Sequence, residues 1–150
     1  MIYLRPARKD DFLGYYTCFD AVARESLALS RHQAPPMPES QAFFDRMMQS
    51  GNPFVLMFHE NLVVGWCDVC ASKERATHGK LGMGILSGLC GLGWGGKLLE
   101  ATLEEARKQN FAIVALSVFS WNERARKLYA RCGFLSVCRV EDTVLMELSL

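Results

Sequence analysis

The chain has 150 residues, the length of one ordinary domain, which is enough to bury a substantial hydrophobic core. Half of the residues are hydrophobic, and 17 Lys and Arg against 16 Asp and Glu leave a formal net charge of +1. This balance predicts a globular protein, and it argues against a nucleic-acid-binding protein or one held at an anionic membrane surface. We therefore expect residues 1–150 to form a single domain.

The beginning of the sequence, MIYLRPARKDD, becomes charged at once, unlike a secretory signal. No apolar run in the sequence approaches the roughly 20 residues that span a bilayer. The six cysteines could form disulfides in a secreted protein. With this N-terminus and a full-sized core, however, we expect reduced thiols and a cytoplasmic location.

The first half of the sequence predicts a strand, two helices and a hairpin. A short strand over 1–4 precedes a helix that begins at 9–11 and continues to about residue 28. A proline-rich loop leads to a second helix, because Pro38 and Glu39 suit a first helical turn and Gly51 suits a helix end. The apolar runs 54–58 and 62–71, separated by three polar residues, predict a β-hairpin.

The second half alternates strands and helices. We expect a strand over 81–86, a glycine-rich turn, a helix to about residue 109 and a strand over 112–119. A last helix over about 122–132 stops at Gly133, and the C-terminal run alternates like a strand. The predicted order is β-α-α-β-β-β-α-β-α-β, a layered fold of the mixed α/β (α+β) class.

The glycine-rich turn is the strongest chemical signal in the chain. Eight of the twelve glycines lie between residues 79 and 96, immediately before an amphipathic helix. Glycine loses more conformational entropy on folding than any other residue, so such a cluster needs a reason. A glycine turn that opens into a helix presents unpaired N–H groups and a favourable dipole to an anion. The sequence therefore predicts a phosphate-bearing ligand near residues 86–96.

Two common phosphate motifs fit this turn poorly. Gly91, Gly93 and Gly96 satisfy the dinucleotide pattern G-x-G-x-x-G. That fold needs an acidic residue at the end of the next strand, and here the strand ends in Phe119-Ser120. The residue after Gly96-Lys97 is leucine, so the turn is not a P-loop. A dinucleotide stays open as the weaker alternative.

Two longer segments, CGLGWGGKLLEATLEEARKQ and LSVFSWNERARKLYARCGF, resemble the GNAT superfamily of acetyl-CoA-dependent N-acetyltransferases. That family carries Arg/Gln-x-x-Gly-x-Gly before its pyrophosphate-binding helix. Gly93 and Gly95 match this motif, whereas Cys90 stands in the place of Arg or Gln. The family's second motif, N-x-x-A-x-x-L-Y-x-x-x-G-F, is complete here in Asn122, Ala125, Leu128, Tyr129, Gly133 and Phe134.

The resemblance is good over residues 54–135, and for the N-terminal segment it rests only on the order and length of the elements. It implies a GNAT-like layered fold, with about six or seven strands in a mostly antiparallel mixed sheet and about four flanking helices. It also implies acetyl-CoA as co-substrate, a primary amine as acceptor, and a homodimer as an allowed assembly. The alternative on the same fold is a non-catalytic module that binds or senses acyl-CoA.

The resemblance assigns the acetyl-CoA contacts to residues of this chain. The strand residues Gly84, Ile85 and Leu86 would meet the pantetheine arm. The pyrophosphate would be surrounded by residues of the turn and of the first helical turn: Gly88, Gly91, Leu92, Gly93, Trp94, Gly95 and Gly96. For Trp94 itself, packing under the loop is the favoured interpretation. Asn122 is either a helix N-cap or a contact to the pantetheine arm.

The resemblance places Tyr129 where the family has the general acid that protonates the departing thiolate. The alternative is core packing, since Tyr129 lies on an apolar helical face with Leu128 and Cys132. Both hold if the ring is buried and the hydroxyl is presented.

A general base is needed because an unperturbed lysine amine has a pKa of about 10.4 and is mostly protonated at neutral pH. Asp68 alternates with Cys67 on a central strand, so one of the two faces the active site. His78 precedes the glycine-rich strand and has a suitable ordinary pKa. Glu25, near the end of the first helix, is a third candidate, and a chain of waters could replace a single base.

The acceptor is expected beside the first two helices and the loop over 30–38. That region carries cationic and aromatic side chains: Arg24, Arg31, His32, Tyr15, Tyr16 and Phe19. A small amine with a carboxylate, a peptide N-terminus and a polyamine all stay open. No metal is expected, because Cys67-x-x-Cys70 lacks a second pair and residues three apart on a strand face opposite ways.

Overall fold

A seven-stranded sheet runs through the molecule in the order β1-β2-β3-β4-β5-β7-β6. The computed structural model describes residues 1–25 and 33–150. The strands are β1 (Ile2–Pro6), β2 (Phe54–His59), β3 (Leu62–Ala71), β4 (His78–Ile85), β5 (Ile113–Phe119), β6 (Leu135–Val140) and β7 (Thr143–Ser149). Every neighbouring pair is antiparallel except β4 and β5, which are parallel.

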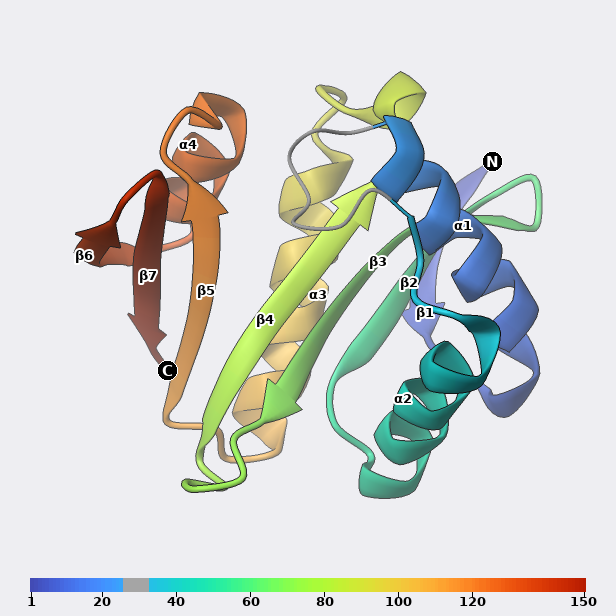
Figure 1. The fold of residues 1–150 in the computed structure, drawn as a ribbon, viewed down its shortest axis with the longest axis horizontal. Coiled ribbons are helices and arrows are strands. Elements are labelled where there is room, and N and C mark those ends of the chain that lie inside the picture. Colours follow the sequence, from blue (N-terminus) through green and yellow to red (C-terminus); the bar gives the residue numbers. More distant parts are fainter. Residues whose placement is uncertain (26–32) are drawn as a thin grey trace.

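The helices cover the two faces of the sheet, as Figure 1 shows. They are α1 (Phe12–Glu25), α2 (Met37–Ser50), α3 (Trp94–Lys108) and α4 (Glu123–Arg131), with short 3-10 turns at Lys9–Asp11 and Ser87–Leu89. One core cluster joins α3 and α4 to the sheet, and the other joins α1 and α2 to the opposite face. Successive side chains of β3 point to opposite faces of the sheet, so Cys67 packs in the first cluster and Trp66 in the second.

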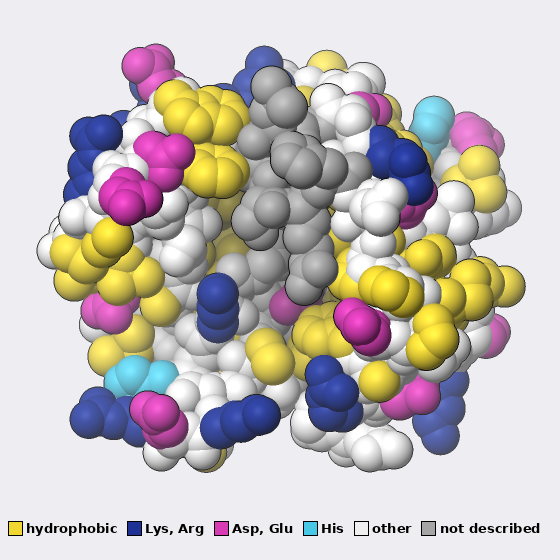
Figure 2. Space-filling view, viewed as in Figure 1, with side chains coloured by type: hydrophobic (Ala, Val, Ile, Leu, Met, Phe, Trp, Pro, Cys, Tyr) yellow, Lys and Arg dark blue, Asp and Glu magenta, His cyan; other side chains and the backbone are white. Residues whose placement is uncertain are grey.

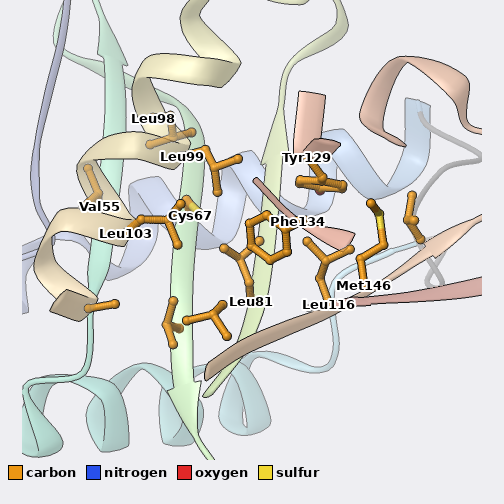
Figure 3. Packing of buried hydrophobic residues seen from close by; sticks show 14 of the residues in the cluster. Val55, Cys67, Leu81, Leu98, Leu99, Leu103, Leu116, Tyr129, Phe134 and Met146 are labelled. Atoms are coloured by element: carbon orange, nitrogen blue, oxygen red, sulfur yellow. The ribbon is translucent and has the colours of Figure 1, made fainter. Parts of the chain in front are cut away.

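The core under α3 and α4 is closely packed. Leu98, Leu99 and Leu103 of α3 are fully buried, and Phe134 is 2% exposed. Figure 3 shows these side chains with Tyr129 of α4, converging on the sheet. The predicted apolar face of the last helix therefore contributes to a real core.

The parallel pair β4–β5 departs from the regular sheet. The two strands are in register only at His78↔Ile113, Gly79↔Val114 and Lys80↔Ala115. They then diverge toward the ends that carry the glycine turn and the start of α4 (Figure 1). From residue 81 to 85, β4 has no strand partner on this side in the described part of the chain. Backbone along this edge is free to bind something other than a strand.

The predicted order of elements is confirmed up to the C-terminus, as are the mixed α/β class and the mostly antiparallel sheet. The C-terminal run forms two strands rather than one, β6 and β7, joined at Glu141-Asp142. Glu141 takes a left-handed backbone angle (φ 55), so no glycine or asparagine marks this turn in the sequence.

The first predicted helix also differs in detail. A 3-10 turn over Lys9–Asp11 precedes α1, and the Asp11 carboxylate accepts from the Arg8 N–H and from the Arg5 guanidinium. The last turn predicted for this helix, together with Arg31 and His32, falls on residues 26–32, outside the described residues. None of the helices in residues 1–25 and 33–150 combines the length and hydropathy needed to cross a membrane.

Candidate functional site

The glycine turn connects β4 to α3 and exposes its backbone. Gly91 and Gly93 both take left-handed angles, with φ of 81° and 86°. A Cβ added at Gly88, Gly91 or Gly93 would meet no atom within 4 Å, so these glycines face open space. Gly93 is the N-cap of the 15-residue α3 and caps it with no side chain. The turn therefore has the form of an anion cradle, with open backbone at the positive end of a helix dipole.

The next glycines serve helix packing. A Cβ at Gly95 would lie 3.3 Å from a methyl group of Leu128 in α4, and one at Gly96 would lie 3.8 Å from the other methyl group. Their small size therefore lets α4 approach the first turn of α3. Trp94 is half-buried against the core, with the Lys97 ammonium 4.4 Å from its ring centre. This is the packing interpretation favoured for Trp94 from the sequence.

The Cys90 side chain is hydrogen-bonded to backbone at the start of the turn. Its Sγ lies 3.6 Å from the carbonyl oxygens of Ile85 and Leu86, to which the thiol donates. The Leu86 carbonyl also accepts from the Leu89 N–H, and the Leu86 N–H donates to the Val64 carbonyl at 2.9 Å. The amide of Leu86 is thus already used within the protein. Cys90 supplies hydrogen bonds to the turn, where Arg or Gln would supply a donor to a ligand.

The end of β4 is shaped by two aligned glycines. Gly84 pairs with Trp66 of β3, and a Cβ at Gly84 would lie 2.5 Å from the indole ring. Gly82 pairs with Asp68, and a Cβ there would lie 3.7 Å from the carboxylate. Both glycines therefore leave room on the side of the sheet that α1 and α2 cover.

Asp68 lies at the bottom of the hollow on that side. The hollow has a volume of about 580 Å³ and lies between α1, α2 and the strands β3 and β4. Asp68 is 8% exposed and has no hydrogen bond or salt bridge among the described residues. Burial raises the pKa of its carboxyl to about 7. Of Cys67 and Asp68, it is Asp68 that faces this hollow, while Cys67 faces α3.

Aromatic rings are the commonest side chains in the wall of this hollow. The Phe19 ring stacks on Trp66 with centroids 4.9 Å apart, and Tyr15 meets Trp66 edge-on at 6.1 Å. The polar groups near its rim are Glu39 and Arg46 of α2. Figure 2 shows hydrophobic and charged side chains interspersed on the half of this face that α1 and α2 form.

Tyr129 lies on the other side of the sheet, in α4. It is 9% exposed, and its ring centre lies 5.8 Å from that of Phe134. Burial raises the pKa of its phenol well above the ordinary value, so the hydroxyl keeps its proton at neutral pH. Its hydroxyl makes no side-chain hydrogen bond within residues 1–25 and 33–150. The residue thus packs as a core residue and retains a proton to donate.

Two further candidates, Asn122 and His78, have clear positions. The Asn122 side chain accepts from the Ala125 N–H at 3.3 Å, so Asn122 is the N-cap of α4. His78 is half-buried at the start of β4 and lines a separate hollow of about 290 Å³ with Ser72 and Lys80. Four residues separate it from Gly82, roughly 13 Å along a strand. The structure does not bring His78 and Asp68 together.

Glu25 has a role that the sequence did not indicate. Its carboxylate accepts a 2.6 Å hydrogen bond from the N–H of Ser87, at the start of the glycine turn. The end of α1 is thus tied to the turn. The sequence pointed to the aromatic residues of α1 but missed Trp66 and Phe43. Trp66 had a signal, because it shares a strand face with Asp68.

Within the described residues, no three or more His, Cys, Asp or Glu side chains are grouped to hold a metal ion. The groups with unusual chemistry are therefore the open turn, the unpaired edge of β4, the buried Asp68 and the protonated Tyr129.

Comparison with known proteins adds a sequence match and several structural ones. A sequence model of the acetyltransferase (GNAT) family matches residues 15–134. No curated protein sequence matches the chain.

Among solved structures, a GNAT-family acetyltransferase from Streptococcus pneumoniae is 22% identical with a TM-score of 0.90, over 100% of this chain and 99% of that one. A ribosomal-protein-alanine N-acetyltransferase from Brucella melitensis is 19% identical with a TM-score of 0.87, over 99% of both chains. A phosphinothricin acetyltransferase from Sinorhizobium meliloti, in complex with acetyl-CoA, is 18% identical with a TM-score of 0.88, over 99% of this chain and 88% of that one. At these identities the likeness is one of fold.

Proposed function

The chain belongs to the acetyltransferase (GNAT) family, and from this premise we propose that it transfers an acetyl group from acetyl-CoA to a primary amine by direct attack. The observation that carries the proposal is the alignment of three features along β4. The last five residues of β4 lack a strand partner on one side, and the open glycine turn follows them. The buried carboxylate of Asp68 lies across from Gly82 in the same strand.

Acetyl-CoA fits the turn and the strand edge. The open sides of Gly88, Gly91 and Gly93 leave room for phosphate against the backbone at the N-terminus of α3. Leu92, Trp94, Gly95 and Gly96 complete this part of the site. The free edge of β4 at Gly84 and Ile85, with the Leu86 side chain, would hold the pantetheine arm. Asn122, at the start of α4, would flank it. A structurally similar acetyltransferase was solved in complex with acetyl-CoA, which supports the choice of ligand.

Asp68 is proposed as the general base. Acetyl-CoA supplies the reaction with an activated thioester. The Asp68 carboxylate takes a proton from the incoming ammonium, which leaves a nitrogen lone pair free to attack. Gly82, opposite Asp68, is two residues from Gly84, roughly 7 Å along the strand, a distance that one water molecule can bridge between the carboxylate and an amine held at Gly84. A pKa near 7 suits a base that must release the proton again. His78, which lines another hollow, is the less favoured base.

Tyr129 is proposed as the general acid. As the new C–N bond forms and the C–S bond breaks, the nitrogen releases its second proton to solvent. The Tyr129 hydroxyl gives its proton to the departing sulfur and later regains one from solvent. Backbone N–H groups on the free edge of β4 suit the charge that develops on the carbonyl oxygen. No covalent enzyme intermediate is needed. Cys90 is hydrogen-bonded within the turn, and burial together with the neighbouring Glu100 carboxylate raises the pKa of the Cys132 thiol, which disfavours a nucleophilic thiolate.

Two measurements test the proposal. Acetyl-CoA at about 100 times its Kd should add about 2.7 kcal/mol to the free energy of unfolding, seen as a rise in Tm that NAD and ATP do not produce. An equal shift with NAD would favour the dinucleotide alternative. In addition, a panel of amines should stimulate release of free CoA thiol. Binding without thiol release from any amine would identify a non-catalytic acyl-CoA module.

A cytoplasmic setting and a homodimer complete the proposal. All six cysteines carry free thiols in the structure, which suits a reducing, cytoplasmic compartment. A homodimer is compatible with the family and is tested by light scattering at working concentrations.

A further inference from the structure

The hollow above Asp68 has a composition that selects among amines. Five aromatic residues of α1, α2 and β3 contribute to its lining: Tyr15, Tyr16, Phe19, Phe43 and Trp66. Pro35, Ala42 and Met83 add further apolar surface. A space of about 580 Å³ with such walls is of the size and character that bury a small organic molecule.

The rings are arranged to contact a flat group. Phe19 and Trp66 stack with an interplanar angle of 28°, and Tyr15 stands at 89° to Trp66. Trp66 is 3% exposed and Tyr15 is 4% exposed, so these two rings are held by their surroundings, and the half-buried rings of Tyr16, Phe19 and Phe43 present the surface to a bound ring. Aromatic faces bind other rings and also cations, so an amine whose ammonium group lies at Asp68 would gain from the rings that line the hollow around it.

The charges that line the hollow balance a single cation. Among the described lining residues, Asp68 and Glu39 are acidic and Arg46 is basic, so the formal charge is −1 with Asp68 ionised. Asp68 is buried, whereas Glu39 and Arg46 are exposed at the rim and in contact with water. One ammonium at Asp68 pairs with the buried carboxylate. A second ammonium held below the rim would find no further carboxylate among the described lining residues, and an unpaired buried charge is costly.

We infer that the acceptor is a monoamine carried on an aromatic ring, with its amino group at Asp68 and its ring against Tyr16, Phe19 and Phe43. This inference rests on the proposed function, because it names the acceptor of the same site. It separates this chain from an enzyme for polyamines and from one for peptide N-termini, whose chain would continue out of the hollow.

The test compares four acceptors with acetyl-CoA by thiol release: 2-phenylethylamine, ethylamine, putrescine and an alanine-initiated tetrapeptide. The KM for 2-phenylethylamine should be lower than that for ethylamine by about ten-fold or more, because only the former buries a ring. Its kcat/KM should also exceed those of putrescine and the tetrapeptide.

A matched pair of variants links the preference to the hollow. Phe19→Leu removes the ring that stacks on Trp66, and Phe58→Leu removes a ring that stacks on Tyr3, 5.0 Å away and outside the hollow. The ratio of kcat/KM for 2-phenylethylamine to that for ethylamine should fall several-fold in Phe19→Leu. In Phe58→Leu this ratio should equal the wild-type ratio.

The outcomes are distinct. Preferred turnover of putrescine or of the tetrapeptide overturns the aromatic acceptor and leaves the acetyltransferase proposal intact. An unchanged ratio in Phe19→Leu, or an equal fall in both variants, overturns the assignment of the ring to this hollow. If none of the four amines causes thiol release, binding is measured separately, by calorimetric titration of 2-phenylethylamine into the protein with CoA present. Binding that Phe19→Leu weakens then retains the aromatic site while the catalytic proposal fails, and absence of binding overturns both.

Discussion

The turn between β4 and α3 presents backbone, whereas the hollow between α1, α2 and the sheet presents side chains. In the turn, open glycines with positive φ leave amide groups uncovered, and the side chain of Cys90, which precedes Gly91, is hydrogen-bonded within the turn. In the hollow, side chains form the surface, among them five aromatic residues and one buried carboxylate. A backbone surface suits a ligand that does not change, since any side chain would only obstruct it. A side-chain surface can be altered residue by residue, so it suits the ligand that distinguishes one enzyme from another.

The largest effect is expected from Gly93→Asp, which should abolish binding at the turn. The new residue would carry a Cβ at φ 86, where side chains are strained, and would place a carboxylate in the space proposed for phosphate. We expect CoA binding to fall below detection in calorimetric titration.

Gly51→Asp is the control for strain alone. Gly51 also has a positive φ, 68°, and open space around its Cβ position, but it lies at the end of α2. This variant should lose similar stability and bind CoA like wild type. Normal CoA binding by Gly93→Asp would instead place the pyrophosphate elsewhere.

The next largest effect is expected from Tyr129→Phe. The substitution keeps the ring against Phe134 and removes only the hydroxyl, so stability and CoA affinity should change little. Loss of a general acid typically costs about 10²–10⁴-fold in rate, and kcat should fall by that amount when chemistry limits turnover.

Tyr3→Phe, which removes a hydroxyl bonded to Asn61 far from the turn, is the matched control for Tyr129→Phe. If Tyr129→Phe turns over like wild type while Tyr129→Ala is damaged by a cavity, Tyr129 is a packing residue and solvent is the proton source.

Asp68→Asn tests the side-chain half of the site. Removing the base should lower kcat/KM for the amine by about 10²-fold, near the lower end of the usual range because water can also accept the proton. In wild type, kcat/KM should rise with pH through about 7, where Asp68 ionises. This limb should vanish in Asp68→Asn and persist in the surface variant Asp45→Asn. A limb near pH 7 that survives in Asp68→Asn would assign the base to another group.

The same substitution should make the protein more stable at pH 8. The carboxyl of Asp68 has a raised pKa of about 7 in the folded state, so between pH 4 and 7 the folded state holds a proton that the unfolded state has lost. Wild-type stability therefore falls as the pH rises through this window, by up to about 4 kcal/mol from this group. Chemical denaturation at pH 4 and pH 8 should show Asp68→Asn gaining relative to wild type only at the higher pH.

The smallest effect is expected at Cys90. Cys90→Arg restores the family's cation beside the turn but gives up the thiol's hydrogen bonds to Ile85 and Leu86. A partly exposed cation contributes little, so CoA affinity should rise by about five-fold or less. Cys90→Ser separates the two effects, since serine can keep the hydrogen bonds without adding charge. A large loss in both variants would show that the thiol itself shapes the turn.

The sequence determined most of the turn half of the site. Its signals are local: the density of glycines, the helix that follows them and the motif that ends in Gly133-Phe134. A turn and a helix N-terminus depend mainly on residues close together in the chain. The same holds for Gly51 at the end of α2 and for Asn122 as the cap of α4, both of which the structure has where the sequence predicts them. The two-residue turn at Glu141 escaped prediction because its left-handed residue is not one of the usual types.

Only the tertiary structure decided the acceptor half. Asp68, His78 and Glu25 looked equivalent as bases in the sequence, because the pKa of a carboxyl or an imidazole depends on burial and on neighbours distant in the chain. The sheet buries Asp68 below Trp66 and α1, carries His78 to the far end of β4, and commits Glu25 to the N–H of Ser87, 62 residues away. These positions depend on register and packing between α1, β3 and the turn, and such long-range contacts leave no local pattern in the sequence.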